Sequence, residues 1–271
     1  MCSLNPHTSE SCFGFDESTG TIIKFYKYEG NDSKNDVCPK DVIIPNKIKG
    51  VDVVTIGGRV FYPDAVGVKI ESVVIPSTVK TIKEGAFRYN GSLKKVTLNK
   101  GLEVIESGAF EFHGTKGAIK EITIPSTIKM IGNEAFQNQN IESLDLSECT
   151  NLTSIGLLAF ANNNLENIIL PQNQDILMYG AFNNNKMRED EAYIYKHTKD
   201  GIDYSEIVSY AGSLKDITIP SEKKGIGLKK IGNGSFYKVN LTNVVIPEGV
   251  EIINDRSFWD NKLTNIIFHQ V

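Results

Sequence analysis

The chain has 271 residues, a formal net charge of −4 and 40% hydrophobic residues, values that fit a folded protein and exclude wholesale disorder. The sequence has no run of about 18 apolar residues, so we expect no membrane span. It also lacks a dense block of lysine and arginine, which argues against nucleic-acid binding, because neutralising phosphates requires clustered cations.

The N-terminal segment, residues 1–40, reads as a cap. Residues 13–28, "FGFDESTGTIIKFYKY", are two alternating runs around the turn residues "ESTG", a pattern that predicts a β-hairpin. The N-terminus has no basic segment followed by an apolar stretch, so we expect no signal peptide in it as written.

The four cysteines, Cys2, Cys12, Cys38 and Cys149, match neither a CxxC pair nor a zinc-binding spacing. We expect free buried thiols, with a Cys12–Cys38 disulfide across the cap as the alternative. Cys2 is either a mature lipoprotein cysteine or an incidental one.

From residue 41 to 271 one phrase recurs. Segments such as "TIKEGAF" and "MIGNEAF" end in a phenylalanine at eight places: Phe61, Phe87, Phe110, Phe136, Phe160, Phe182, Phe236 and Phe258. Their spacing is 22–26 residues, apart from one interval of 54. A fixed period of this length is typical of a repeat solenoid.

Each repeat also carries a strand-like piece upstream of its phenylalanine, such as "ESVVIP" or "KEITIP". Apolar residues alternate with period two, so we expect Val73 and Ile75 to point inward and Ser72 and Val74 outward. An aliphatic residue stands five positions before each phenylalanine, and we expect these to be buried: Ile56, Ile82, Ile105, Ile131, Ile155, Leu177, Ile231 and Ile253. No single repeat could bury these residues alone, so the coils must stack.

The repeat L-x-x-I-x-I-P-x-x-V-x-x-I-G-x-x-A-F, seen almost complete in "IKEITIPSTIKMIGNEAF" (119–136), resembles the BspA-like (Treponema pallidum-type) leucine-rich repeat family. The resemblance implies a right-handed superhelix of about eight repeats, with a parallel β-sheet on its concave face and short helical or 3-10 turns. It also implies a bacterial protein that is secreted or displayed on the cell surface and binds proteins of the host or of other cells.

The 54-residue interval contains an insertion, residues 183–213, with four tyrosines and two predicted strands around Asp200-Gly201. Two interpretations stay open. The insertion is a tyrosine-rich binding protrusion, with Tyr193, Tyr195 and Tyr204 as contact residues. Alternatively, it is an elongated repeat whose tyrosines pack on the solenoid.

The outward strand positions are the other candidate ligand-binding residues. They form one column that is largely uncharged: Val74, Thr97, Thr123, Asp145, Ile169, Thr218 and Val245. An even face of this kind suits an extended protein or glycan ligand. The competing interpretation is that β-branched residues are there because strands favour them.

No motif for catalysis, metal or cofactor is found: the four histidines lie far apart, and neither HExxH nor G-x-S-x-G occurs. We therefore expect a protein without cofactor or enzymatic activity that binds a host or bacterial surface protein outside the cell. Two alternatives remain open, a carbohydrate- or cell-wall-binding module and the targeting arm of a larger protein.

Overall fold

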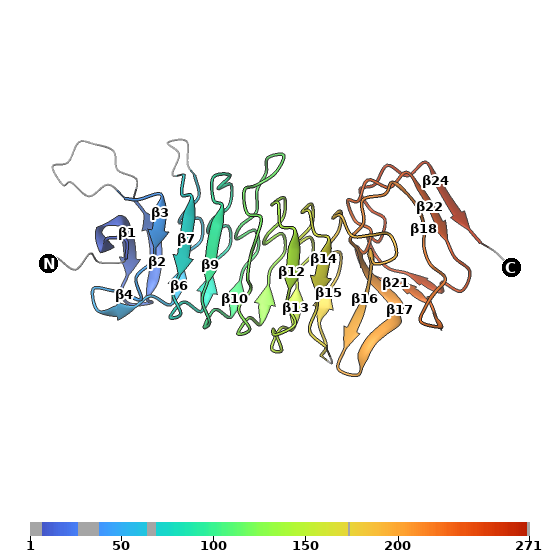
Figure 1. Cartoon of the computed structure of the whole chain (residues 1–271), viewed down its shortest axis with the longest axis horizontal. Helices are drawn as coiled ribbons and strands as arrows, with labels where there is room; N and C mark the ends of the chain where they lie inside the picture. Colours follow the sequence, from blue (N-terminus) through green and yellow to red (C-terminus); the bar gives the residue numbers. More distant parts are fainter. Residues whose placement is uncertain (1–6, 27–37, 64–68, 173, 270–271) are drawn as a thin grey trace.

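The computed structural model describes residues 7–26, 38–63, 69–172 and 174–269, which form an elongated stack of coils (Figure 1). Most coils contribute a long strand to one side of the stack and a two-residue strand to the other. Turns join the two sides. The predicted solenoid is confirmed.

The N-terminal cap is a short 3-10 helix, η1 (Glu10–Cys12), followed by the antiparallel strands β1 (Phe13–Asp16) and β2 (Thr21–Phe25). The predicted hairpin is therefore confirmed. Strand β2 continues into the solenoid, because it pairs in parallel with β6 (Thr55–Ile56) and aligns Ile22 with Ile56. The hairpin thus covers the first coil.

Cys12 and Cys38 form a disulfide, with their Cα atoms 5.6 Å apart. The expectation of free thiols was wrong for this pair. The two cysteines are 26 residues apart, about one coil, so the stack brings them side by side. Cys149 is free and buried, as expected, and Cys2 lies outside the described residues.

The long strands form three separate parallel sheets, ordered β3-β7-β9, β12-β14 and β18-β22-β24. Val73 and Ile75 are fully buried, which confirms the predicted alternation. The strand expected at residues 120–125 is absent, since this segment joins no ladder. The strands are β3 (Asp41–Ile43), β7 (Ser72–Ile75), β9 (Lys95–Leu98), β12 (Ser143–Asp145), β14 (Asn167–Ile169), β18 (Asp216–Thr218), β22 (Asn243–Ile246) and β24 (Asn265–Phe268).

The short strands pair in parallel around the predicted aliphatic column, in two sheets: β6, β8, β10, β11, β13 and β15 continue from the N-terminal hairpin, and β21 and β23 continue from the hairpin of the insertion. Two positions were wrong. Ile253 is 43% exposed, and Met178 takes the place of Leu177: Met178 pairs with Ile155 and is 1% exposed, whereas Leu177 is 59% exposed. This coil is one residue shorter before its phenylalanine, which shifts the register. The strands are β6 (Thr55–Ile56), β8 (Thr81–Ile82), β10 (Val104–Ile105), β11 (Met130–Ile131), β13 (Ser154–Ile155), β15 (Leu177–Met178), β21 (Lys230–Ile231) and β23 (Ile252–Ile253).

The insertion is a further coil that carries a long hairpin, β16 (Tyr193–Thr198) and β17 (Gly201–Tyr210). Strand β17 also pairs in parallel with β21 and aligns Ile207 with Ile231. Tyr210 takes the place of the coil phenylalanine and stacks on Phe236 with ring centroids 5.5 Å apart. Two loops form smaller antiparallel hairpins: β4 (Lys47–Ile48) with β5 (Val51–Asp52), and β19 (Glu222–Lys223) with β20 (Ile226–Gly227).

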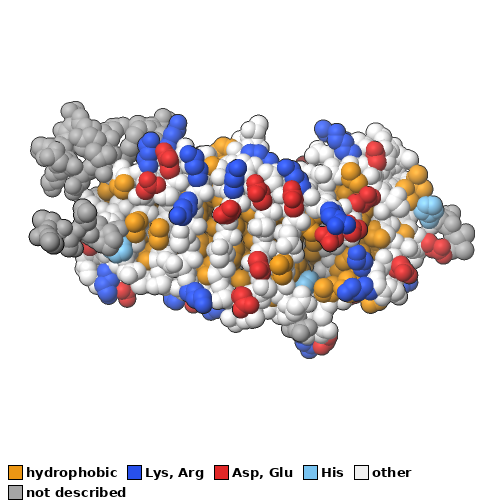
Figure 2. Space-filling view, viewed as in Figure 1, with side chains coloured by type: hydrophobic (Ala, Val, Ile, Leu, Met, Phe, Trp, Pro, Cys, Tyr) orange, Lys and Arg blue, Asp and Glu red, His pale blue; other side chains and the backbone are white. Residues whose placement is uncertain are grey.

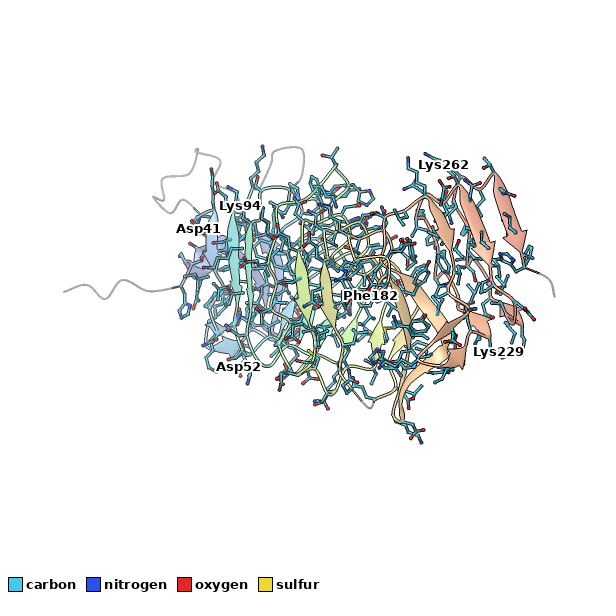
Figure 3. The ribbon with its side chains drawn as sticks, turned by 45° about the vertical axis from the view of Figure 1, so that its right-hand side comes forward. Asp41, Asp52, Lys94, Phe182, Lys229 and Lys262 are labelled. Carbon is cyan, nitrogen blue, oxygen red and sulfur yellow. A yellow bond between two sulfur atoms is a disulfide. The ribbon has the colours of Figure 1, made fainter. Side chains whose placement is uncertain are left out.

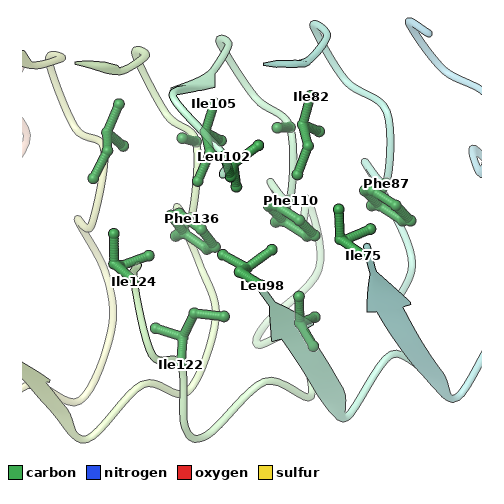
Figure 4. Close-up of a cluster of buried hydrophobic side chains, with 14 of the residues drawn as sticks. Ile75, Ile82, Phe87, Leu98, Leu102, Ile105, Phe110, Ile122, Ile124 and Phe136 are labelled. Carbon is green, nitrogen blue, oxygen red and sulfur yellow. The ribbon is translucent and has the colours of Figure 1, made fainter. Parts of the chain in front are cut away.

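The coil phenylalanines stack along the axis, with successive ring centroids 4.6–5.8 Å apart from Phe61 to Phe182 (Figure 4). Short helical or 3-10 turns were expected at the segments that carry these phenylalanines. They are turns closed by hydrogen bonds between residues three apart, such as that from Arg88 N–H to the Gly85 carbonyl, and those described are not helices. Each buried ring contributes roughly 1.5–3 kcal/mol to folding.

A ladder of buried amides runs beside the stack, three residues after most coil phenylalanines. The Asn163 side chain donates to the carbonyls of Phe136 and Phe160 at 2.9 and 3.0 Å and accepts from Ile141 N–H at 3.0 Å. It thereby satisfies backbone groups that no strand can reach. The other ladder residues are Asn90, Gln139, Asn185 and Asn261.

The hydrophobic core consists of two clusters that meet between the coils of Phe182 and Tyr210. A buried polar group lies at the boundary. The Asn183 side-chain oxygen, Oδ1, accepts from Ser209 Oγ at 2.8 Å and from Tyr210 N–H at 3.1 Å. The ring stack is interrupted there, and the hairpin β16–β17 projects from the same place.

Candidate functional site

Six of the seven predicted outward residues lie on the long strands, and Thr123 lies in residues 119–125, which join no ladder. Exposed hydrophobic side chains are spread along the molecule among charged ones (Figure 2). Backbone register places Val74 beside Thr97, Asp145 beside Ile169 and Thr218 beside Val245. All seven are at least partly exposed. The structure therefore aligns them in a row along the stack, broken where the three sheets are separate. We refer to these outward positions as the long-strand face.

The long-strand face mixes exposed aliphatic side chains with polar groups that are already hydrogen-bonded. Ile43, Ile169 and Ile267 are exposed. The Asp216 carboxylate accepts from Thr242 Oγ1 at 2.6 Å and from the Asn243 amide, and these bonds lower its pKa. Such a face can contact a ligand through β-branched side chains while its few carboxylates are held in fixed positions.

A groove of about 360 Å³ lies where β14 meets the hairpin β16–β17, and four predicted residues line it: Ile169, Tyr193, Tyr195 and Tyr204. We call it the junction groove. Tyr195 and Tyr204 meet edge to face with centroids 5.3 Å apart. The structure thus brings the strand column and the insertion together at one place, which sequence periodicity did not indicate.

The tyrosines are less available than the protrusion hypothesis requires. Tyr193 is 8% exposed and Tyr195 is 7% exposed, and the Tyr193 hydroxyl donates to the Thr218 carbonyl at 3.1 Å. Burial raises the pKa of both phenols, that of Tyr195 to about 12. Tyr193 and Tyr195 therefore pack on the solenoid, as the second interpretation of the insertion states, and their rings form the floor of the junction groove. Of the three candidate tyrosines, Tyr204 keeps the largest exposed surface.

Charged groups line the junction groove and lie on the hairpin beside it. Asp190, Glu191 and Lys223 are in its lining, and Lys223 Nζ donates to the Asp190 carbonyl at 2.9 Å. Lys224 Nζ lies 5.1 Å from the centre of the Tyr204 ring. Glu206 is buried between Lys196 and Lys230, with Nζ to carboxylate distances of 3.3 and 3.1 Å. His197 is buried with Nδ1 3.0 Å from the Pro171 carbonyl, and burial lowers its pKa.

The other face of the solenoid has a hollow of about 550 Å³ that the sequence interpretation missed. Met130 and Leu177 are exposed at its edge, and Gly132 and Gly156 line its floor. The available signal was an apolar residue directly before the buried aliphatic one, as in Met130-Ile131. In a strand, such a neighbour points to solvent.

A buried ion cluster lies on the turn side of the stack. The Glu111 carboxylate contacts Arg88 Nη2 at 2.7 Å and also His113, and burial raises its pKa despite these partners. Among the described residues, no three or more His, Cys, Asp or Glu side chains are placed to hold a metal ion. None of the described helices is long and apolar enough to cross a membrane.

Comparison with protein families gives a match to the BspA type leucine rich repeat region, in six copies over residues 54–188 and 204–271. No curated protein matches the chain.

Two solved structures share the fold. One is a leucine-rich repeat protein from Bacteroides ovatus, 19% identical, with a TM-score of 0.52, covering 99% of this chain and 77% of that chain. The other is the pneumococcal vaccine antigen PcpA, 22% identical, with a TM-score of 0.55, covering 91% of this chain and 65% of that chain.

Proposed function

Because the chain belongs to the family of BspA-type leucine-rich repeat proteins, whose solenoid fits a protein-binding module, we propose that it is a non-catalytic adhesion protein. It acts outside the cell or on its surface and binds a protein of a host or of another bacterium. The observation that carries the proposal is the long-strand face, a row of exposed Thr, Val and Ile side chains held in register along the stack.

This geometry suits binding better than catalysis. Catalysis needs acid, base or nucleophilic groups that act together on one bond. The charged groups of the long-strand face are instead tied to neighbours, as Asp216 is to Thr242 and Asn243. Extended rows of β-branched side chains give contact area with little loss of side-chain entropy.

The test is binding of the purified chain to a panel of immobilised extracellular-matrix and plasma proteins. A variant with Thr97, Thr123, Ile169 and Thr218 changed to Lys adds four charges to the long-strand face. The matched control changes Thr55, Thr81, Val104 and Ser154 to Lys, which places the same charges on the other sheet. We expect saturable binding that only the first variant loses, with both variants folded by circular dichroism. Binding that the first variant retains would refute the proposal.

Glycan binding is the second candidate, and Trp259 is the observation that favours it. This residue, the single tryptophan of the chain, is exposed and stacks on Tyr237 with centroids 5.6 Å apart. Arg256 lies 5.0 Å from the ring centre and restricts access to it. Titration of cell-wall glycans against the intrinsic tryptophan fluorescence tests this role. A saturable change that Tyr237→Ala weakens supports it, and an unchanged spectrum contradicts it.

A further inference from the structure

The long-strand face contains an opening between β9 and residues 119–125. Strand β9 pairs with β7 on one edge only. Across the described part of the chain, no backbone hydrogen bond connects β9 to residues 119–125, although the sequence there alternates like a strand. Figure 4 shows Leu98 of β9 beside Ile122 and Ile124, whose backbone is not drawn as a strand.

The opening leaves backbone groups of β9 unpaired in the middle of a solenoid. Lys95 N–H donates toward β7, to the carbonyl of Glu71. Alternate residues of a parallel strand bond to opposite neighbours, so Val96 and Leu98 direct their N–H and carbonyl groups to the opening. An edge of this kind is a template for an added strand.

The core is also uncovered at this point. Val96, Leu98, Ile122 and Ile124 are 5–9% exposed, whereas the matching residues of β7, Val73 and Ile75, are 0% exposed because β7 pairs on both edges. The opening has a volume of about 880 Å³, within the range of ligand-binding pockets.

The loop before residues 119–125 is bonded to the coils that follow it. Glu121 follows Phe110 by 11 positions, the same separation as that of Ser72 from Phe61 in the regularly paired strand β7, so loop length alone does not open the sheet. Lys116 Nζ donates to the Asn162 carbonyl at 2.5 Å, and Asn140 Nδ2 donates to the Gly117 carbonyl at 2.7 Å. These bonds tie the loop to the following coils and away from β9.

The rim of the opening is basic. Lys94, Lys95 and Lys120 line it, with Glu121 as the one carboxylate among the lining residues. Lys94 Nζ also lies 3.8 Å from a carboxylate oxygen of Glu71, which is not among the lining residues. An incoming segment therefore meets a net positive rim above an apolar floor.

We propose that this opening binds an extended acidic segment of a partner protein as an added β-strand. Side chains of a strand alternate between the two faces. The segment that fits has aliphatic residues facing Val96 and Ile122 and acidic residues facing the lysines. The inference deepens the proposed function, on which it rests, by naming the kind of segment that is recognised.

The test uses a fluorescein-labelled heptapeptide of alternating valine and glutamate, capped at both ends, and anisotropy with the full chain. Two control peptides have lysine in place of glutamate, or N-methyl groups that remove the backbone donors. We expect saturable binding of the acidic peptide only. Equal binding of the lysine or the N-methylated peptide, or no saturable binding by the folded chain, overturns the proposal.

Charge reversal on the protein gives the second readout. Lys95→Glu with Lys120→Glu should weaken binding about tenfold or more, since two favourable charge contacts become repulsive. The matched control, Lys215→Glu with Lys262→Glu, makes the same change on distant coils, and Lys262 lies along the same edge as Lys94 (Figure 3). An equal loss of affinity in both variants contradicts the site.

Amide exchange distinguishes strand addition from attraction to lysines alone. On peptide binding, Val96 and Leu98 amides should exchange about tenfold more slowly, whereas Val73, already in a ladder, should not change. Unchanged exchange at Val96 and Leu98 overturns the added strand.

Failure of this inference is separable from failure of the proposed function. In the protein panel, Thr97→Glu with Thr123→Glu adds charges to the opening that repel an acidic segment, whereas Ile169→Glu with Thr218→Glu adds the same charges away from the opening. Partner binding that only the second pair abolishes contradicts the role of the opening and keeps the adhesion proposal. If the peptide binds but no protein of the panel does, the result supports strand addition at the opening and contradicts the proposed adhesion to matrix or plasma proteins.

Discussion

Ile131 and Ile253 hold the same position of the repeat, five residues before a coil phenylalanine, and differ in burial from 1% to 43% exposed. The coil of Ile131 has a neighbouring coil on both sides, because β11 pairs with β10 and β13. Strand β23 pairs only with β21. The comparison shows that a repeat has no core of its own: its apolar residues are buried by the coils on either side.

The largest expected effect on the free energy of unfolding comes from removing a ring in the middle of the stack. Phe136 is fully buried between Phe110 and Phe160, so Phe136→Ala should lower the free energy of unfolding by about 3–5 kcal/mol. Phe258 stacks on Phe236 and is only partly buried, so Phe258→Ala should lower the free energy of unfolding by clearly less. Urea denaturation of both variants measures the difference, and equal losses would contradict the shared-core argument.

The next effect concerns the other end of the stack, where a disulfide fastens the cap. Cys12→Ser with Cys38→Ser should lower the free energy of unfolding by about 2–4 kcal/mol, because the closed loop of 26 residues no longer restrains the unfolded chain. Reductant should destabilise the wild type and leave this variant unchanged. A variant at the free thiol, Cys149→Ala, is the control that should still respond to reductant.

A smaller effect is expected from the amide ladder that links neighbouring coils. Asn163→Ala leaves the Phe136 carbonyl without its side-chain donor and Ile141 N–H without its acceptor, and should lower the free energy of unfolding by about 1–3 kcal/mol. The exposed Asn151→Ala is the matched control and should be nearly neutral. Thermal denaturation followed by circular dichroism compares them; equal changes would mean that the ladder contributes nothing specific.

The smallest effect is the pH dependence at the junction between the two core clusters. Burial lowers the pKa of His197, so the unfolded chain binds the proton more readily than the folded chain. Stability should therefore fall as pH drops below about 6.5, by at most about 1.4 kcal/mol per pH unit, and level off below the folded-state pKa. His197→Asn, which keeps a donor for the Pro171 carbonyl, should remove this slope.

The quantity to measure is the difference in the free energy of unfolding between the wild type and His197→Asn at each pH from 5 to 8. The difference is needed because the raised pKa of Glu111 gives a contribution of opposite sign. Identical pH profiles for the two proteins would exclude His197 as the titrating group.

Much of the fold could be predicted because the repeat is local and copied. The period located the coils, the alternation placed Val73 and Ile75 inward, and the turn residues located both hairpins. The coil of Tyr210 escaped detection because tyrosine replaces the phenylalanine on which the repeats were aligned. Leu177 was misplaced for a related reason, since one missing residue shifts a two-residue strand by a full position.

The candidate site was predictable only in part. The sequence placed Thr97, Thr123 and Ile169 on one outward column, and this follows from strand alternation alone. It did not indicate that Ile169 meets Tyr204 in one groove, or that Tyr193 and Tyr195 form its floor. Those features depend on how the coil of the hairpin packs against its neighbours.

The sequence by itself therefore determined the stacking unit, because a 22–26-residue period with fixed apolar positions can bury its core in few other ways. Only the tertiary structure decided the pairing of Cys12 with Cys38, the burial of the tyrosines and the opening beside β9. Each of these depends on contacts between coils. Side-chain bonds, such as that of Lys116 to Asn162, hold a loop against the coils that follow it.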